Sequence, residues 1–469
     1  MQTPKPKVPL IIPVENQVRE LDPKLLLACI AARRGFASYI GSRREFHFKI
    51  TSFPRGIYLS KSITGASDMM FRIMRHLGHE VVAWDEEALV HLPAETYYSR
   101  RLSPVAMAHV SRLCAWGEDN AELWRQYPRL PKNAVIDITG NPRNDLLRPE
   151  LHAYYDLEVE KIKKAYGNFI LVNTNFNHVN AFTPVQNLFQ PNENGGEIPK
   201  FGRAAKGMSR EYAEGLRDHK QAIFEDFQRM IPALDEAFPD YRIVVRPHPT
   251  ESQEIYYDIA ARCKQVKVTN EGNVVPWLLA TRALVHNSCT TGAEAYVMRV
   301  PAITYRASID ETYDFGFYRL PNLISHTCFN IEELLATLKK ILSGELGPAG
   351  GEDRKQLIEY YLAAHDGPLA SERIVDVLED IVGGQPELPK PNIGGHISGW
   401  SLWAVRTLIK RYKDSRPNSH NRPEFQRHRY PKVSLEDMQN RVNRFKRVLN
   451  LRENLKVEPV FDEFFQIRA

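Results

Sequence analysis

The sequence predicts an α/β fold with two large lobes and a basic C-terminal extension. Short runs of β-branched residues alternate with amphipathic helical stretches along most of the chain, a pattern typical of parallel βαβ units. A chain of 469 residues is also too long for one ordinary hydrophobic core. Hydrophobic residues make up 43% of it and charged residues 25%, which is ordinary for a soluble globular protein.

The first lobe is expected to occupy residues 1–155. It begins with a strand-like run and a polar loop, and an amphipathic helix then ends near Gly35. A turn-rich segment at 139–145, followed by a charged helix, places the end of this lobe. The strands expected here are 8–14, 37–40, 56–59, 81–84, 112–116 and 135–138.

The second lobe is expected at 165–385, where a second alternating series begins. A long helix near 211–238 follows its first strand, and a Gly/Pro-rich linker at 383–398 follows its last helices. Two Rossmann-like lobes in series that face a central cleft form the GT-B arrangement, although other two-lobed α/β proteins share this pattern. The strands expected in this lobe are 169–173, 241–245, 266–268, 283–286 and 301–305.

The extension at 386–469 is expected to be helical and is strongly basic. Between Val405 and Arg447 there are thirteen Lys/Arg against four Asp/Glu, within a chain of net charge +5. Apolar and aromatic residues from Trp400 onwards are interleaved with these cations, which fits an interfacial helix on anionic lipid over 400–447. The alternative is a helix that crosses back to brace the first lobe. Nucleic-acid binding is not expected, because no recognised module is present.

Composition also bounds the compartment and the chemistry. No apolar run approaches the roughly 20 residues needed to span a bilayer, and the N-terminus makes a poor signal peptide. The five cysteines are odd in number and lack metal-ligand spacing. We therefore expect a cytoplasmic protein with reduced thiols and no structural zinc, and the basic segment 400–447 favours a peripheral position on the inner face of a plasma membrane.

The segment Arg246-Pro247-His248-Pro249 ends the apolar run 241–245 abruptly. It places Arg246 and His248 at the carboxyl end of a strand, where open α/β sheets bind their ligands. Both side chains can donate hydrogen bonds to a phosphate, and Pro249 stiffens the loop. Taken alone, however, four residues are a weak signal.

A second loop supports the phosphate interpretation. It follows the strand 283–286 and opens a helix, so that small hydroxyl residues could cap the helix and its free amides could bind an anion. Together with Arg246 and His248 it predicts a two-sided phosphate grip, whereas helix capping alone is the plainer explanation. The donor-binding residues expected here are Asn287, Ser288, Thr290, Thr291, Gly292 and Glu294.

Two further loops are candidates for contacts with a nucleotide or sugar. Glu271 and Asn273 precede a helix and could face the sugar or the base, or Asn273 could simply cap that helix above a buried Trp277. Asn173, Thr174 and Asn175 follow the first strand of the second lobe, where they could bind donor or acceptor hydroxyls. A plain polar turn is the alternative for this second loop.

In the first lobe, Asp85, Glu86 and Glu87 follow the strand 81–84. Three consecutive acids repel one another, so at least one is expected to have a raised pKa, which suits a general base. A solvated acidic helix start is the alternative. Weaker candidates in this lobe are Glu15, Arg19 and Glu20 in the loop after the first strand, and Arg55 and Lys61, which could meet an anionic acceptor.

Over most of residues 8–385 the chain resembles the bacterial surface-carbohydrate biosynthesis proteins of GT-B type. More distantly, it is similar to bacterial GT-B sialyltransferases and Kdo transferases. The pieces that carry the resemblance are 18–22, 85–87, 139–143, 173–176, 271–277 and 286–292. The resemblance implies that an acidic pair serves as general base, and Ala88 stands where the sialyltransferase pattern has a glycine.

By the same resemblance, His248-Pro249 matches the His-Pro motif, and Ser288, Thr290 and Thr291 lie where a Ser/Thr motif binds the phosphate of CMP. The implied activity is transfer of an acidic sugar, Kdo or a sialic-acid-like nonulosonate, from a CMP-activated donor to a glycan or lipid-linked acceptor. Glu86 or Glu87 would remove the acceptor proton, with no cofactor and no metal. The alternatives are a CDP-glycerol-type glycerophosphotransferase and a non-catalytic nucleotide-binding membrane scaffold.

Overall fold

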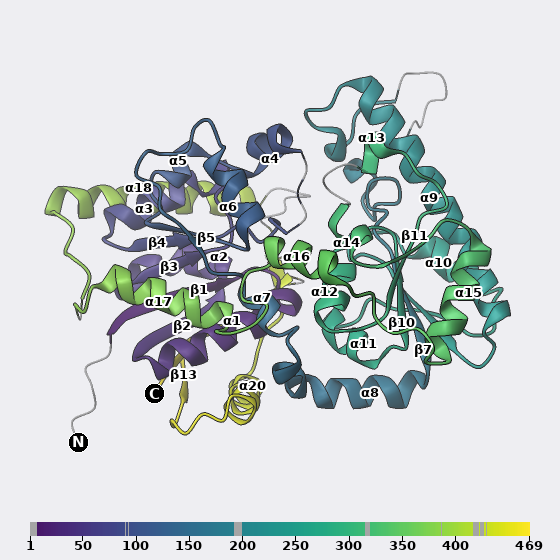
Figure 1. Cartoon of the computed structure of the whole chain (residues 1–469). Coiled ribbons are helices and arrows are strands. Elements are labelled where there is room, and N and C mark those ends of the chain that lie inside the picture. The colour runs from purple at the N-terminus through teal and green to yellow at the C-terminus, as the bar shows by residue number, and fades with distance from the viewer. Residues whose placement is uncertain are drawn as a thin grey trace. The chain divides into compact units, whose positions relative to one another are not determined.

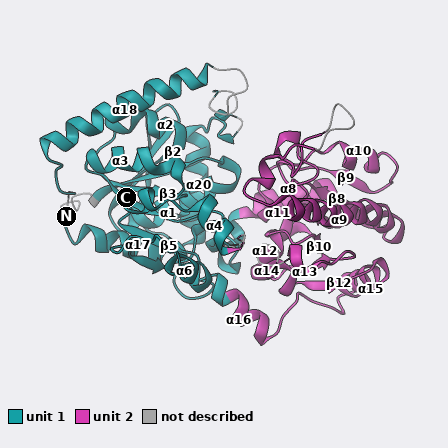
Figure 2. Ribbon diagram, turned by 90° about the horizontal axis from the view of Figure 1, so that it is seen from above, with its two compact units in different colours: residues 1–89, 94–154, 359–469 teal, residues 90–93, 155–358 magenta. Residues whose placement is uncertain are grey.

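The computed structural model describes residues 7–469 except 90, 92, 192–198, 315–318, 386, 416–421, 423–425 and 428. The chain forms two compact units (Figure 2). Unit 1 comprises residues 1–89, 94–154 and 359–469, and unit 2 comprises 90–93 and 155–358. Because residues 416–421, 423–425 and 428 are not described, part of the basic segment 400–447 lies outside the described residues.

Unit 1 is built on an eight-stranded sheet with the order β13-β14-β2-β1-β3-β4-β5-β6 (Figure 1). Six of its strands are parallel, and the C-terminal hairpin joins the edge of the sheet antiparallel to β2. The strands are β1 Lys7–Val14, β2 Phe36–Ser42, β3 Ile57–Ser60, β4 Glu80–Ala83, β5 Arg112–Ala115, β6 Ile136–Ile138, β13 Lys456–Phe461 and β14 Phe464–Arg468.

The helices of unit 1 pack around this sheet, and several contribute buried apolar residues to its core. Phe46, Phe53 and Phe464 meet in the core, with ring centroids 4.5 to 5.1 Å apart. The helices are α1 Gln17–Arg33, α2 Arg43–Lys49, α3 Asp68–His76, α4 Ala94–Arg101, α5 Pro104–Met107, α6 Glu118–Arg125, α7 Pro142–Asp145, α17 Ala370–Val382, α18 Ile393–Asp414 and α20 Leu435–Val448. Short 3₁₀ helices occupy Ile50–Ser52, Gly65–Ser67 and Pro149–Tyr155.

Unit 2 is built on a six-stranded, fully parallel sheet with the order β12-β11-β10-β7-β8-β9. Its strands are β7 Phe169–Asn173, β8 Arg242–Arg246, β9 Val266–Val268, β10 Ala283–His286, β11 Ala302–Tyr305 and β12 His326–Cys328. Its helices are α8 Asp156–Tyr166, α9 Arg210–Ala237, α10 Glu254–Ala260, α11 Val274–Ala280, α12 Thr291–Val297, α13 Glu311–Asp314, α14 Arg319–Leu323 and α15 Ile331–Leu342. Helix α16 Glu352–Tyr361 runs from unit 2 into unit 1, and short 3₁₀ helices lie at Pro184–Gln186 and Arg203–Ala205.

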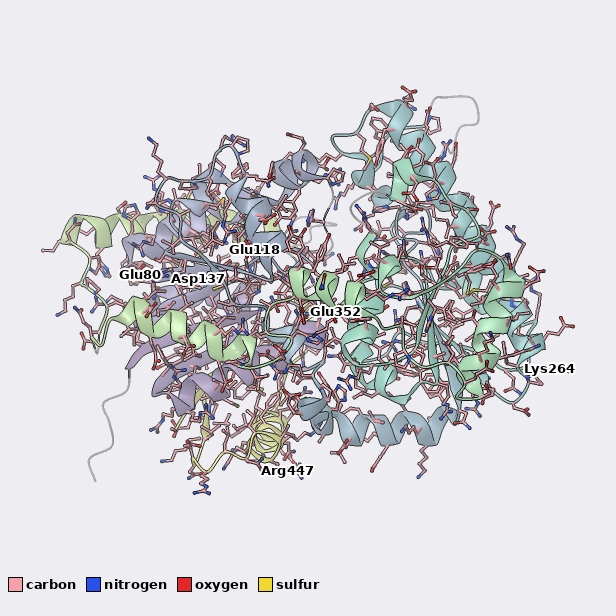
Figure 3. All side chains as sticks on the ribbon, viewed as in Figure 1. Glu80, Glu118, Asp137, Lys264, Glu352 and Arg447 are labelled. Atoms are coloured by element: carbon pink, nitrogen blue, oxygen red, sulfur yellow. The ribbon has the colours of Figure 1, made fainter. Side chains whose placement is uncertain are left out.

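The predicted α/β class with two Rossmann-like parallel sheets is confirmed, whereas a cleft between the lobes stays a prediction. The C-terminal region contains the expected helices α18 and α20, but it ends in the hairpin β13–β14, which was not predicted. Strand β13 buries only Val457, whereas β14 buries Phe464, Phe465 and Ile467. Lys264 and Arg447 illustrate charged side chains that point away from the sheets (Figure 3).

The structure also divides the chain differently from the predicted ranges. Unit 2 ends at Ile358 rather than at 385, because the helix α17 packs in unit 1. The buried Asp145 carboxylate accepts hydrogen bonds from the backbone amides of Ala370 (2.7 Å) and Ser371 (2.8 Å) at the start of α17. Residues 386–469 likewise belong to unit 1 and are not a separate extension.

Two further observations bear on the composition-based expectations. Within the described residues, no helix is long and apolar enough to cross a bilayer.

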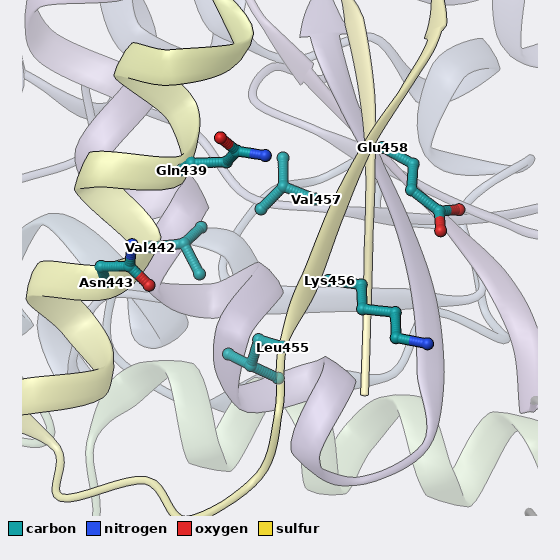
Figure 4. A pocket seen from close by; sticks show the side chains of 7 residues that line it. All are labelled: Gln439, Val442, Asn443, Leu455, Lys456, Val457 and Glu458. Atoms are coloured by element: carbon teal, nitrogen blue, oxygen red, sulfur yellow. The ribbon is translucent and has the colours of Figure 1, made fainter.

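A shallow pocket of about 350 Å³ opens between α20 and β13 (Figure 4). It is lined mainly by aliphatic and amide side chains, so we place the candidate chemistry elsewhere.

Candidate functional site

The strand order of unit 2 reverses beside β7. Strands β8 and β9 extend the sheet on one side of β7, and β10, β11 and β12 extend it on the other. Open parallel sheets bind ligands beyond the carboxyl ends of their strands at such a reversal. Asn173, the last residue of β7, pairs in register with Arg246 on β8 and His286 on β10. Three of the loops singled out in the sequence therefore begin side by side.

Asn173 and Asn287 carry buried amide atoms without hydrogen-bond partners among the described residues. These atoms are Oδ1 of Asn173 and both Oδ1 and Nδ2 of Asn287. The two residues are only 4% and 3% exposed. Because burying an unpaired polar group costs about 1–3 kcal/mol, native proteins rarely leave one unsatisfied. These amides therefore mark the reversal point as the candidate ligand site of unit 2.

His248 lies at the same edge with a defined ring tautomer. The backbone N–H of Thr250 donates to Nδ1 at 3.3 Å, and the Thr250 hydroxyl lies 2.8 Å from the same atom. Since Nδ1 accepts, the proton of the neutral ring is on Nε2. The side chain is half-buried. An N–H donor of this kind suits a phosphate oxygen.

Glu251, which the sequence analysis missed, ties the loops after β7 and β8 together. Its carboxylate accepts hydrogen bonds from the Thr174 hydroxyl (3.0 Å), the His248 backbone amide (3.0 Å) and the Tyr256 hydroxyl (2.7 Å). Burial raises the pKa of Glu251, and these hydrogen bonds oppose the rise. Thr174 was predicted to contact the donor, but its hydroxyl is directed at Glu251. Only the position of Glu251 next to the His-Pro loop could have drawn attention to it.

Arg246 also differs from its predicted orientation towards a phosphate. Its guanidinium donates to the carbonyls of Glu271 (2.9 Å) and Gly272 (3.1 Å) and lies 4.7 Å from the centre of the Trp277 ring. Burial lowers its pKa to about 10. Arg246 therefore positions the loop after β9. Pro249 is exposed at the end of its own loop.

The loop after β9 shows the contacts expected of a capped helix. The Asn273 side chain accepts a hydrogen bond from the Val275 amide at 3.0 Å, and Trp277 is 5% exposed. The Trp277 indole donates to the Glu271 carbonyl at 3.1 Å. Strand β9 lies at the edge of the sheet, so this loop is beyond β8 and not between the two phosphate loops as in the sequence. Contacts of Glu271 and Asn273 with a nucleotide stay a prediction.

The turn after β10 is held by its own hydroxyl contacts. Ser288 has a φ of 59°, and its hydroxyl donates to Oδ1 of Asn322 at 3.0 Å. Asn322 accepts a second hydrogen bond from Thr304 on β11, at 2.7 Å. Thr290 stands at the N-cap of α12, but its side chain makes no capping hydrogen bond. The expectation that hydroxyl side chains cap this helix is therefore wrong for Thr290, and Ser288 has a structural partner.

Gly292 has a packing role in the same turn. A Cβ atom there would lie 2.6 Å from Nε2 of the buried His286 ring. Burial lowers the pKa of His286 to about 3, so the ring is neutral. The other donor-side candidates are Thr291 and Glu294, which are buried on α12, and Asn175, which is half-buried after β7. Their contact with a donor stays a prediction.

In unit 1 the strand order reverses beside β1, with β2 on one side and β3 to β6 on the other. Glu15 follows β1, Lys61 follows β3, and Asp85 to Glu87 follow β4, so these candidates share the carboxyl edge of the parallel strands. Arg55 does not, because it precedes β3 and lies at the opposite edge. Its guanidinium donates to the carbonyls of Leu388 and Pro389 at 3.0 and 2.9 Å. The predicted acceptor-side role of Arg55 is therefore corrected.

The three consecutive acids point to different partners. Asp85 is buried and accepts from Arg101 and from the Tyr97 hydroxyl. Glu86 is 4% exposed and accepts from the Trp84 indole at 2.6 Å. Glu87 is half-exposed and pairs with Arg19 at 3.1 Å.

Electrostatics in this cluster differ from the expected mutual repulsion. Partial burial favours the protonated form of Glu87, but Arg19 and Arg143 lower its pKa below the ordinary value. Glu87 is therefore not the acid for which a raised pKa was expected. Neighbouring guanidinium groups outweigh the repulsion between carboxylates.

Glu86 lines a pocket of unit 1. This narrow pocket has no room for a water molecule in this structure, and its lining also includes Lys24 and Arg143, with Arg143 Nε 3.9 Å from Glu86 Oε1. The full lining is Glu20, Pro23, Lys24, Trp84, Glu86, Asn141, Pro142 and Arg143. Both charge types and an amide are thus available beside Glu86.

Glu15 and Lys61 belong to a buried ion-pair network next to this pocket. Lys61 Nζ lies 3.1 Å from Glu15 and 2.5 Å from Glu20, which is 1% exposed. Burial opposes ionisation of Glu15, but Arg43, Lys61 and Arg429 lower its pKa to about 2. Glu20, a weaker candidate in the sequence, is thus a buried member of this ion-pair network.

Comparisons with known proteins found solved structures that resemble this chain only weakly. No family model and no curated protein matches it. The solved wall teichoic acid polymerase TagF soaked with CDPG is 13% identical, covers 81% of this chain and 90% of its own, and has a TM-score of 0.49. The UDP-GlcNAc 2-epimerase from Methanocaldococcus jannaschii is 12% identical over 79% of this chain and 99% of its own, with a TM-score of 0.46. The S. aureus MnaA–UDP co-structure is 12% identical over 82% and 99%, with a TM-score of 0.45. The assignment of the fold therefore rests on the strand orders of the two units.

Proposed function

We propose that this chain is a glycosyltransferase of surface polysaccharide biosynthesis whose unit 2 binds a nucleotide-activated sugar. The observation that carries the proposal is the set of buried amide atoms without partners among the described residues, Oδ1 of Asn173 and both Oδ1 and Nδ2 of Asn287, at the reversal point of the sheet. An amide offers both a donor and an acceptor, which suits sugar hydroxyls or a base edge. His248 adds a donor for a phosphate oxygen.

The donor that we propose is a CMP-activated acidic sugar, Kdo or a sialic-acid-like nonulosonate. The acceptor is a glycan or a lipid-linked glycan at the inner face of the plasma membrane. The resemblance at 85–87, 248–249 and 288–291 supports this choice of donor. No cofactor is part of the proposal.

In the proposed reaction the acceptor oxygen forms a bond to the anomeric carbon, and the bond from that carbon to the phosphate oxygen breaks. The acceptor proton passes to Glu86, and the electron pair leaves with CMP, whose phosphate accepts a hydrogen bond from Nε2 of His248. Glu86 is preferred over Glu87 because it lines the pocket of unit 1, whereas Glu87 is held ionised by Arg19. A carboxylate with a lowered pKa is a weaker base.

Titration calorimetry with CMP, CDP and UDP tests the donor assignment. We expect CMP to bind, and Asn287→Ala or Asn173→Ala to weaken its binding about 10- to 100-fold, as for a lost hydrogen bond to a buried partner. Asn168→Ala is the matched control, because Asn168 is exposed next to the opposite end of β7.

Each titration outcome has a distinct meaning. Tight binding of UDP without CMP overturns the CMP donor. Preference for CDP favours a CDP-glycerol-type glycerophosphotransferase. If CMP binds the Asn287→Ala and Asn168→Ala variants with equal affinity, the proposed site in unit 2 is wrong. Nucleotide binding without any turnover favours a non-catalytic scaffold.

A further inference from the structure

Helix α18 is fixed to unit 1 by one face. A Cβ atom at Gly399 would come within 3.0 Å of α3, so the two helices lie in close contact. The Trp403 indole donates to the backbone carbonyl of His47 at 3.2 Å. At the end of the helix Asp414 pairs with Arg44 at 2.5 Å. Figures 1 and 2 show α18 along the surface of unit 1. Helix α18 therefore braces unit 1, which was one of the two predicted alternatives. This packing determines which residues of α18 face outward.

The outward face of α18 is a continuous apolar stripe. Its residues are one to five positions apart, and at about 100° per residue they all fall within roughly one half of the helix circumference. We call this set the α18 stripe: Ile393 (82% exposed), Ile397 (61%), Trp400 (44%), Val405 (57%), Leu408 (67%), Ile409 (49%) and Tyr412 (62%). Single exposed apolar residues are normal, but seven on one side of one helix indicate an interaction surface.

The charges of α18 are almost all positive. Residues 393–413 contain no Asp or Glu, and the acid Asp414 is paired with Arg44. Arg406 turns inward to Nδ1 of His47 at 3.3 Å. Arg411 and Lys413 are exposed at the C-terminal end of the helix. An exposed apolar row flanked by cations complements an anionic lipid surface.

We propose that the α18 stripe docks unit 1 onto an anionic membrane surface, with the helix lying in the plane of the interface. Trp400 and Tyr412 have the amphipathic rings that are enriched at the headgroup level. The absence of acids on this face disfavours a cationic or mixed-charge protein partner. Membrane binding by this face goes beyond the proposed transferase function and does not depend on it.

Vesicle flotation tests the proposal with the full chain. Wild-type protein is expected to float with vesicles that contain phosphatidylglycerol, and less with phosphatidylcholine alone. Ile397→Glu combined with Leu408→Glu should lower the bound fraction on anionic vesicles at least roughly tenfold, since both side chains leave water on docking. Leu157→Glu is the control, because Leu157 is 50% exposed on α8 of unit 2.

The contribution of the cations to membrane binding can be tested separately from that of the apolar stripe. Arg411→Gln combined with Lys413→Gln should weaken binding to anionic vesicles only, and added salt should weaken wild-type binding in the same way. Circular dichroism melting of each variant shows whether it is folded like the wild type.

Three results would overturn the proposal. The wild type could fail to float with anionic vesicles. The Ile397→Glu/Leu408→Glu variant could float as well as Leu157→Glu. Light scattering could show a wild-type dimer that this variant converts to a monomer without loss of vesicle binding, so that the stripe contacts a second copy. None of these results bears on CMP binding by unit 2, so the two proposals fail separately.

Discussion

Glu86 and Glu87 are adjacent in the chain, but their carboxylates lie in different surroundings. Glu86 is buried, accepts a hydrogen bond from the Trp84 indole and lines a pocket, whereas Glu87 pairs with Arg19 near the surface. The difference arises because successive residues after a strand point in different directions. Residue type alone therefore left the choice of base open. The two acids are distinguished by their partners, Arg19 on α1 for Glu87 and Arg143 on α7 for Glu86.

Replacement of each acid tests this difference. Glu86→Gln should lower kcat for sugar transfer about 10²- to 10⁴-fold, the range for loss of a general base. Glu87→Gln, the matched control, should retain kcat within about tenfold, since only an exposed ion pair is lost. Initial rates with a CMP-sugar measure both, and calorimetry should show unchanged CMP affinity. Full activity of a Glu86→Gln/Glu87→Gln double variant would contradict the assignment.

Among the elements, the β10–α12 turn shows how local packing positions the donor loop. The left-handed Ser288, the buried His286 ring and Gly292 fit together without space for another carbon. The His286 ring donates from Nε2 to the Ser325 hydroxyl at 2.9 Å, because that hydroxyl already donates to the Pro321 carbonyl. Asn287 lies between His286 and Ser288 in this turn, and its buried amide has no partner among the described residues.

Gly292→Ala should therefore destabilise unit 2. The new Cβ would meet the His286 ring at 2.6 Å, and overpacking of this kind costs about 1–3 kcal/mol. Gly347→Ala is the control, since a Cβ there meets nothing within 4 Å. Urea unfolding followed by circular dichroism compares the two. Equal midpoints for both variants would show that the turn adjusts without cost.

At the scale of the whole molecule, the chain returns to its first unit after completing the second. Residues 359–469 add α17, α18, α20 and the β13–β14 hairpin to unit 1, where β14 pairs antiparallel with β2. Phe464 enters the core that Phe46 and Phe53 begin. Each unit also buries a neutral histidine, His79 in unit 1 and His286 in unit 2.

These two histidines predict acid sensitivity of both units. Burial lowers the pKa of His79 to about 4 and that of His286 to about 3. The unfolded chain binds these protons near pH 6.5, so stability is lost as the pH falls from about 6.5 towards 4. Each histidine should remove about 2 kcal/mol of unfolding free energy between pH 7 and pH 5.

Thermal unfolding of His79→Asn at pH 7 and pH 5 checks this sign. An asparagine Oδ1 can still accept the Gly56 N–H that His79 Nδ1 accepts at 3.2 Å, so the variant should fold. Its transition should depend less on pH than that of the wild type. An unchanged or steeper dependence would contradict the role of His79.

Much of the architecture follows from local patterns. The β-branched runs at 169–173, 241–245 and 283–286 form strands within a residue or so of the predicted bounds, because such runs favour buried extended backbone. The loops that follow them lie at one edge of the sheet, since all its strands are parallel. The roles of Arg246 and Thr174 were less predictable, because their partners Glu271 and Glu251 depend on how separate loops fold together.

The sequence by itself determined where the strands lie and which polar loops follow them, because burial and turn chemistry act over a few neighbouring residues. Only the tertiary structure decided that β7 lies between β8 and β10, that Glu86 and Glu87 have different partners, and that α18 keeps an apolar stripe exposed. These features depend on contacts between residues far apart in the chain. Local propensity carries no information about such contacts.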